Sequence, residues 1–200
     1  FSLMAVFTRS AGASVFTVAA WRAIFVALVF GAWMLVKTGP GSFRVDRQTL
    51  EISGWMGLAL AIASATFVGG YAYTTVANTI FLHNLAPVAV FPLAWWMFRE
   101  KPAPVVLTGT GIAVAGVAML SGVSLFQVSH FASARFLLGD VLALVSALGY
   151  AGVLVMTRKA RQAETPIVPT LFYAWTLAAV GLTVVALAVD TMAASPLALA

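Results

Sequence analysis

The 200-residue chain contains no cysteine, and charged side chains make up only 8% of its residues. The absence of cysteine excludes disulfide bonds and thiolate metal ligands. Soluble domains carry about 25% charged residues. Hydrophobic residues make up 62% of this chain, and a water-soluble fold with so few charged residues could not bury that much apolar surface. The sequence therefore predicts that a lipid bilayer surrounds most of the chain, with room for roughly six or seven spans of about 20 residues each.

Motifs of ATP-driven pumps and of hydrolytic membrane enzymes are also missing. The sequence has no GxxxxGK[ST] phosphate loop, no HExxH metal pair, no GxSxG nucleophile turn and no cluster of carboxylates within its apolar runs. Its two histidines, His83 and His130, have no metal-ligand partner at helical spacing. We therefore expect no metal, no cofactor and no enzymatic function.

Six apolar runs are long enough to cross a bilayer. They occupy residues 14–36, 54–76, 78–98, 105–126, 137–157 and 167–189. The apolar stretch 1–8 is too short to span and is interpreted as the end of a truncated helix. The predicted fold class is an all-α, polytopic membrane helix bundle.

Basic residues are divided unequally between alternate gaps. Eight Lys and Arg residues lie in the gaps 37–53, 99–104 and 158–166, against Arg9 and Arg135 in the opposite gaps. The positive-inside rule places the richer gaps in the cytoplasm. The net charge of +5 is explained by this topology, so we expect the bilayer, and no nucleic acid, as a partner.

The run 78–98 differs from the others in its polar residues and prolines. Pro87 has no N–H group and frees the carbonyl of His83, four residues earlier. Free carbonyls are tolerated in a membrane only where the helix faces protein or a wet cavity. The predicted cavity-lining face consists of Thr79, His83 and Pro87 at a spacing of four, with Asn84 and Phe91 beside them.

Two interpretations of His83 are open. An intramembrane histidine either hydrogen-bonds a neighbouring helix or serves a ligand or a proton. Tyr71 in the preceding span is a candidate for the same cavity, although interfacial anchoring explains a tyrosine there equally well. Ser146 and Tyr150 share a helix face and are further candidates for substrate contact.

Arg22 lies about eight residues into its span, where an arginine costs at least about 2.5 kcal/mol on insertion scales. It either extends its side chain to the external headgroups or contacts an anion or an ion-pair partner. Asp140, after Gly139 at the start of the run 137–157, is interpreted as a helix cap.

Glycine-rich stretches are predicted to let helices approach closely. The pair Gly69 and Gly70 is interpreted as a close helix contact in preference to a hinge. The run 105–120 is predicted to pack through small residues, of which the glycines are Gly109, Gly111 and Gly116.

The stretch from Leu85-Ala86-Pro87 through Arg99-Glu100-Lys101 and on to the glycine-rich helix resembles the EamA-like repeat of the drug/metabolite transporter superfamily. The shared pattern is an aliphatic-Ala-Pro step, an acidic residue at the inner helix end, a short turn with proline and a helix rich in glycine. The resemblance implies ten helices in two inverted five-helix repeats. On that plan residues 1–126 are the first repeat with a truncated helix 1, and residues 137–200 are the start of a truncated second repeat.

The resemblance also has consequences for the site. Arg22, Pro87 and Glu100 match the positions that mark the family, with Arg22 and Glu100 in structural or anion-contacting roles, and the central cavity receives helices 3, 4 and 6. It implies a secondary transporter that exports small metabolites or drugs across the cytoplasmic (inner) membrane by alternating access. Two alternatives stay open, namely an intramembrane enzyme that acts on a lipid through His83 or Arg22, and a polytopic scaffold subunit. The sequence does not indicate the substrate, the coupling ion or the oligomeric state.

Overall fold

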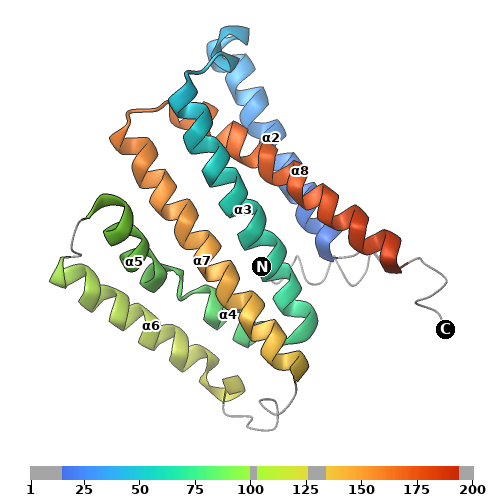
Figure 1. Cartoon of the computed structure of the whole chain (residues 1–200), viewed down its shortest axis with the longest axis vertical. Helices are drawn as coiled ribbons and strands as arrows, with labels where there is room; N and C mark the ends of the chain where they lie inside the picture. The colour runs from blue at the N-terminus through green and yellow to red at the C-terminus, as the bar shows by residue number, and fades with distance from the viewer. Residues whose placement is uncertain (1–14, 100–102, 126–133, 194–200) are drawn as a thin grey trace. The chain divides into compact units, whose positions relative to one another are not determined.

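The computed structural model describes residues 15–99, 103–125 and 134–193, and these form helices without a β-strand (Figure 1). The elements are α2 (Val15–Thr38), the short 3₁₀ helix η1 (Pro40–Phe43), α3 (Arg47–Tyr73), α4 (Val76–His83), α5 (Ala86–Phe98), α6 (Pro104–Leu125), α7 (Ala134–Gln162) and α8 (Ile167–Ala193). The expected truncated helix in residues 1–8 lies outside the described residues.

Five helical segments are long and apolar enough to cross a membrane. They are Phe16–Lys37, Arg47–Tyr73, Val76–Phe98, Ala134–Gln162 and Ile167–Val189. The remaining predicted span, residues 105–126, coincides with α6, in which Pro104–Gly116 forms a shorter apolar stretch. The prediction of an all-α polytopic helix bundle is confirmed.

Helix α3 begins several residues before its apolar run because polar side chains stabilise its first turn. The Thr49 hydroxyl donates a hydrogen bond to the carboxylate of Asp46, and the Leu50 amide donates to the Asp46 carbonyl at 3.2 Å. Arg47 and Glu51 form an ion pair at 2.9 Å one turn apart. Both side chains of this pair are exposed, so the pair contributes little to stability, and the start of α3 depends on the cap at Asp46.

Packing divides the chain into two units, residues 1–61 with 160–200 and residues 62–159. Each unit draws helices from both of the predicted repeats. In the first unit, α2 packs mainly against α8. The buried faces of these helices are formed largely by alanine, namely Ala19, Ala23 and Ala27 on α2 and Ala174, Ala178 and Ala186 on α8. Small side chains allow the backbones to approach closely, as is typical of membrane helices.

Helix α3 joins the first unit through a glycine. A Cβ atom on Gly57 would lie 2.7 Å from the carbonyl oxygen of Ala174, which leaves no room for any larger residue. Two turns further along the same face of α8, a Cβ atom on Gly181 would lie 3.3 Å from the Cβ of Ala61, which is tighter than an ordinary contact. These contacts fix α3 against α8.

The second unit is held together in the same way. A Cβ atom on Gly139 would lie 2.6 Å from the backbone nitrogen of Thr74, and one on Gly70 would lie 3.0 Å from the Cγ2 of Thr79. The close contact predicted at Gly70 is confirmed. On α7 the residues that follow this contact toward its C-terminus on the same face are also small and buried: Ala143, Ala147 and Ala151.

The predicted close packing of the glycines on α6 is wrong for the part of the chain that the structure describes. Nothing lies within 4 Å of a Cβ atom built on Gly109, Gly111 or Gly116, and all three residues are exposed. Small size permits a close approach but does not cause one, and none of the described residues lies against these three positions of α6.

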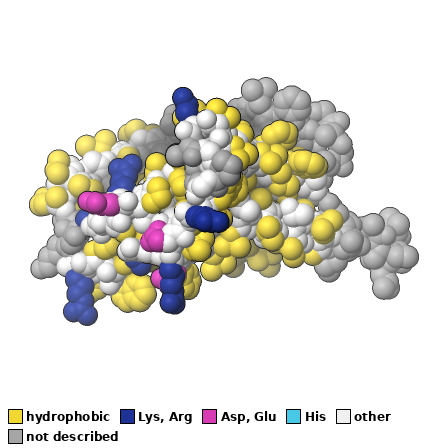
Figure 2. All heavy atoms as spheres, turned by 90° about the horizontal axis from the view of Figure 1, so that it is seen from above, with side chains coloured by type: hydrophobic (Ala, Val, Ile, Leu, Met, Phe, Trp, Pro, Cys, Tyr) yellow, Lys and Arg dark blue, Asp and Glu magenta, His cyan; other side chains and the backbone are white. Residues whose placement is uncertain are grey.

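Charged side chains lie toward the ends of the helices. Figure 2 looks onto one end, where Lys, Arg, Asp and Glu side chains interrupt the hydrophobic surface. In the second unit, Arg158 lies with its guanidinium 5.0 Å from the ring centre of Phe98. Near the other end of α7, Arg135 donates to the carbonyl of Ala72 at 3.4 Å. A spanning α7 therefore carries Arg135 and Arg158 to opposite membrane surfaces.

Candidate functional site

The third predicted span, residues 78–98, is broken into two helices at Asn84 and Leu85. Helix α4 ends at His83, and α5 begins at Ala86 with Pro87 in its first turn. Proline is tolerated there because the first turn needs no donated N–H. The amides of Val88 and Ala89 both donate to the carbonyl of Leu85, at 2.9 and 3.2 Å. Since Pro87 has no N–H, the carbonyl of His83 receives no bond from the residue four positions later.

This break corrects the prediction of one continuous face. Thr79 is buried and His83 is partly buried on α4, whereas Asn84 and Pro87 are exposed. Phe91 is partly buried on α5, and within the described residues it makes no ring contact with His83. A spacing of four places residues on one face only while the helix is continuous, and here it ends between His83 and Pro87.

His83 is hydrogen-bonded to the neighbouring helix α7. Its Nδ1 atom lies 2.8 Å from the Oγ of Ser146, and Ser146 is fully buried. The Ser146 hydroxyl also lies 2.8 Å from the carbonyl oxygen of Ala143, one turn earlier in α7. Of the two interpretations of an intramembrane histidine, the contact with a neighbouring helix is therefore observed.

Aromatic rings surround the imidazole of His83. The ring centre of Phe67 lies 4.5 Å from that of His83, and the ring of Tyr150 lies at 5.3 Å on a tilted plane. Tyr71 packs edge-on against Phe67 at 4.8 Å. We call Phe67, Tyr71, His83, Ser146 and Tyr150 the His83 cluster. It unites four of the residues that were predicted from sequence.

Phe67 is the member of this cluster that the sequence did not single out. It is one of 14 phenylalanines in an apolar chain, so its type carries no signal. Its position four residues before Tyr71 on α3 places the two rings on the same helix face. That spacing is the one indication the sequence offered.

A second polar contact joins α4 to α7. The side-chain amide of Asn78 donates a hydrogen bond to the carboxylate of Asp140, and it also lies 3.4 Å from the hydroxyl of Thr74. The interpretation of Asp140 as a helix cap is wrong, because α7 begins at Ala134 and Asp140 lies within it. Its carboxylate joins two helices.

Besides Pro87, the resemblance marks Arg22 and Glu100, and neither belongs to the His83 cluster. Arg22 is partly buried on α2, within the first unit. Glu100 falls outside the described residues. The structure therefore adds no contact that assigns either residue to a substrate.

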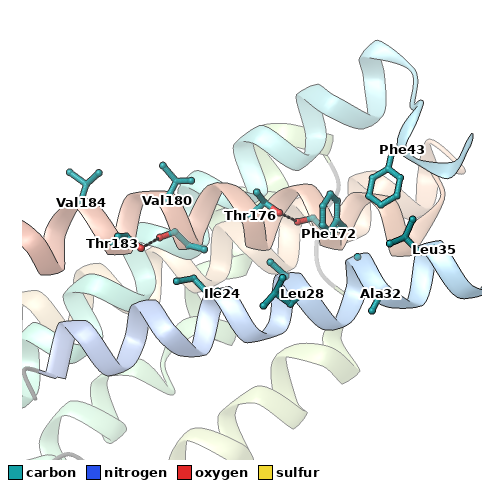
Figure 3. A pocket seen from close by; sticks show the side chains of 13 residues that line it. Ile24, Leu28, Ala32, Leu35, Phe43, Phe172, Thr176, Val180, Thr183 and Val184 are labelled. Atoms are coloured by element: carbon teal, nitrogen blue, oxygen red, sulfur yellow. Dashed lines mark hydrogen bonds between the residues drawn. The ribbon is translucent and has the colours of Figure 1, made fainter. Parts of the chain in front are cut away.

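An apolar pocket of about 720 Å³ lies between α2 and α8 in the first unit. Figure 3 shows Phe43 and Phe172 near one end of it and Ile24 and Leu28 of α2 along its side. Two threonines reach the pocket, but the Thr176 and Thr183 hydroxyls each donate at 2.8 Å to a carbonyl of their own helix. The pocket therefore offers apolar contact and little to select a polar solute.

The enzymatic alternative would require a nucleophile and a general base. The Ser146 Oγ and the His83 Nδ1 are 2.8 Å apart, which is the distance such a pair needs. A nucleophile must reach the substrate, and Ser146 is 0% exposed. Its hydroxyl is also bonded to the carbonyl of Ala143. The pair is suited to joining two helices and orienting the imidazole, and it is unsuited to attack on a lipid.

A bundle of spanning helices with a buried polar contact beside a broken helix defines a polytopic integral membrane protein with an intramembrane polar site. The EamA-like transporter family matches residues 1–122, and the chain belongs to that family of membrane transporters. No curated protein and no solved structure matches the chain.

Proposed function

We propose that the protein is a secondary transporter that exports small solutes across the cytoplasmic membrane by alternating access. The observation that carries the proposal is the hydrogen bond between His83 and Ser146, next to the break between α4 and α5. A polar pair inside apolar helices is costly unless it serves packing or a passing solute. Broken helices at membrane depth commonly border substrate sites in transporters.

The His83 cluster is the proposed contact site for the solute. Tyr150 and the imidazole are partly exposed within the second unit, so a solute can reach them, whereas buried Ser146 acts through His83. Alternating access requires two repeats that move against each other. We accordingly propose that residues 1–126 and the segment from 137 onward belong to two inverted repeats.

Transport by inside-out and right-side-out vesicles tests this function. Vesicles that contain the protein are loaded with a panel of labelled metabolites and drugs, and an imposed ion gradient drives uptake or release. Export predicts solute accumulation in inside-out vesicles that the protein-free vesicles lack. Accumulation in right-side-out vesicles alone would contradict export, and no gradient-driven flux for any solute would contradict the transporter proposal.

Substitutions then test the site. His83→Ala and Tyr150→Ala should each lower the rate of transport by about 5- to 150-fold, because each removes a contact worth about 1 to 3 kcal/mol. Thr108→Val is the matched control, since Thr108 is exposed on α6 and its hydroxyl donates to the carbonyl of Pro104 in its own helix. Equal rates in all three variants would remove the His83 cluster from the solute path.

The enzymatic and scaffold alternatives predict different results. An enzyme acting on a lipid would convert that lipid in vesicles without any gradient, and it would lose this activity in Ser146→Ala. A scaffold would show neither flux nor conversion, and it would co-purify with a partner. The burial of Ser146 favours transport over the enzymatic alternative.

A further inference from the structure

We propose that Ser146 fixes the tautomer of His83, so that the imidazole presents an unprotonated Nε2 atom as an acceptor for an N–H or O–H group of the solute. The part of this inference that concerns the solute rests on the proposed function. The tautomer itself is a property of the folded protein, and it is measurable without any transport.

The tautomer follows from counting hydrogens at Ser146. A serine hydroxyl has one hydrogen, and the Ser146 Oγ lies 2.8 Å from both the Ala143 carbonyl oxygen and the His83 Nδ1. If the hydrogen points to the carbonyl of Ala143, the Nδ1 of His83 must carry a hydrogen and donate to Oγ. Both contacts are then hydrogen bonds.

The opposite arrangement satisfies fewer groups. If the hydroxyl of Ser146 donated to Nδ1, no hydrogen would lie between its oxygen and the carbonyl oxygen of Ala143. Only the bond to His83 would then remain. Ser146 is fully buried, so water cannot replace the lost bond. Buried polar groups adopt the arrangement that satisfies most of them, and this arrangement is the Nδ1–H tautomer.

The Nε2 atom of a neutral Nδ1–H imidazole has a free lone pair. Within the described residues no hydrogen bond reaches the Nε2 of His83, and the side chain is partly exposed. The rings of Phe67 and Tyr150 lie against the imidazole. A hydrogen-bond donor carried on an apolar body therefore matches both the lone pair and the surrounding rings.

Ser146 is in this arrangement a positioning residue. It is too buried to touch a solute, and its effect passes through the orientation and protonation of His83. Threonine at this position would keep the hydroxyl, whereas alanine would release the tautomer.

Nitrogen NMR of the protein with ¹⁵N-labelled histidine tests the tautomer directly. The chain has two histidines, so His130→Gln leaves the signals of His83 alone. At neutral pH we expect a protonated Nδ1 and an unprotonated Nε2, retained in Ser146→Thr and replaced by a tautomer mixture in Ser146→Ala. An Nε2–H tautomer or a doubly protonated ring in the protein with native Ser146 would overturn the inference, even if Ser146→Ala fails to fold.

Two probe compounds test the class of solute. Phenethylamine and its N,N,N-trimethyl derivative share an aromatic body and a positive charge, but only phenethylamine has N–H groups. We expect phenethylamine to shift the Nε2 resonance of His83 and to bind at least about tenfold more tightly than the trimethyl compound, as the loss of a charged hydrogen bond predicts.

The other outcomes of the binding and NMR experiments would each overturn part of the inference or of the proposed function. Equal binding of the two compounds would overturn donor recognition and assign the affinity to the ring faces. No shift with either compound would overturn the solute class while the tautomer result stands. A confirmed tautomer together with absent flux in vesicles would refute the transporter proposal alone, so the two failures are distinguishable.

Discussion

The side-chain amide of Asn78 on α4 hydrogen-bonds the carboxylate of Asp140 on α7, 62 residues later in the chain. The same two helices are joined by the pair of His83 and Ser146, so α4 is attached to α7 through two polar contacts. Asn78 and His83 are five residues apart, which places the contacts about 7.5 Å apart along α4 at the helical rise.

Loss of the contact between Asn78 and Asp140 is expected to destabilise the protein. Asn78→Ala leaves a partly buried carboxylate without this donor and should lower the free energy of unfolding by about 0.5 to 2 kcal/mol. Unfolding by SDS in mixed micelles, followed by circular dichroism, measures the change. Asn84→Ala on the exposed side of the break is the control, and equal losses in the two variants would contradict the role of the contact.

Substitution of Gly139 by alanine is expected to separate α7 from the end of α3. The new Cβ would lie 2.6 Å from the backbone nitrogen of Thr74, and backbone atoms cannot move aside as a flexible side chain can. The cost is about 1 to 3 kcal/mol, measurable by the same unfolding experiment. Gly111→Ala on the open face of α6 should instead be neutral or stabilising by up to about 1 kcal/mol through helix propensity. A neutral Gly139→Ala would show that the helices lie farther apart.

The orientation in the membrane can be tested without removing any native thiol, because the chain has no cysteine. Single substitutions Arg44→Cys, Arg161→Cys and Arg135→Cys provide labelling sites in three gaps between helices. In intact cells a membrane-impermeant maleimide should label only Arg135→Cys, and in inside-out vesicles it should label the other two variants. The reverse pattern would invert the topology.

The start of α3 is expected to weaken in acid. The hydroxyl of Thr49 donates to Asp46 and holds the pKa of that carboxyl below its ordinary value. A lowered pKa in the folded state means that the contribution of this cap is present above the unfolded pKa of about 4 and is lost as the pH falls through the folded pKa.

A ¹³C NMR titration of the carboxyl group of Asp46 measures this effect. Thr49→Val should raise its pKa toward the ordinary value, and the dependence of α3 stability on pH below about 4 should flatten. An unchanged pKa of Asp46 in Thr49→Val would contradict the proposed cause.

The helical spans were predictable because burial in lipid demands long apolar runs that are visible along the chain. The run 14–36 corresponds to α2, Val15–Thr38, and the run 167–189 to α8, Ile167–Ala193. Helix starts were less predictable where a polar first turn precedes the apolar run. The caps that extend α3 back to Arg47 depend on side-chain geometry at Asp46, which hydrophobicity does not report.

The site was predicted as a set of residues and not as a set of contacts. His83, Ser146 and Tyr150 were all named from their polarity inside apolar runs, but the pairing of His83 with Ser146 depends on how closely α4 approaches α7. Close glycine contacts in this unit, such as the one at Gly139, help to set that approach. The position of the helix break was misjudged because Pro87 begins a new helix, and it does not interrupt a continuous one.

The alanine faces of α2 and α8 have a consequence for the entropy of assembly. A methyl side chain has no rotamers to lose, so packing of these faces avoids the cost of up to about 1 kcal/mol that each buried leucine or isoleucine incurs. The two helices can therefore separate and rejoin without any side chain changing its rotamer at those positions. Where the ring of Phe172 lies against Gly31, a large side chain still loses its rotamer freedom, so the entropic advantage belongs to the alanine positions alone.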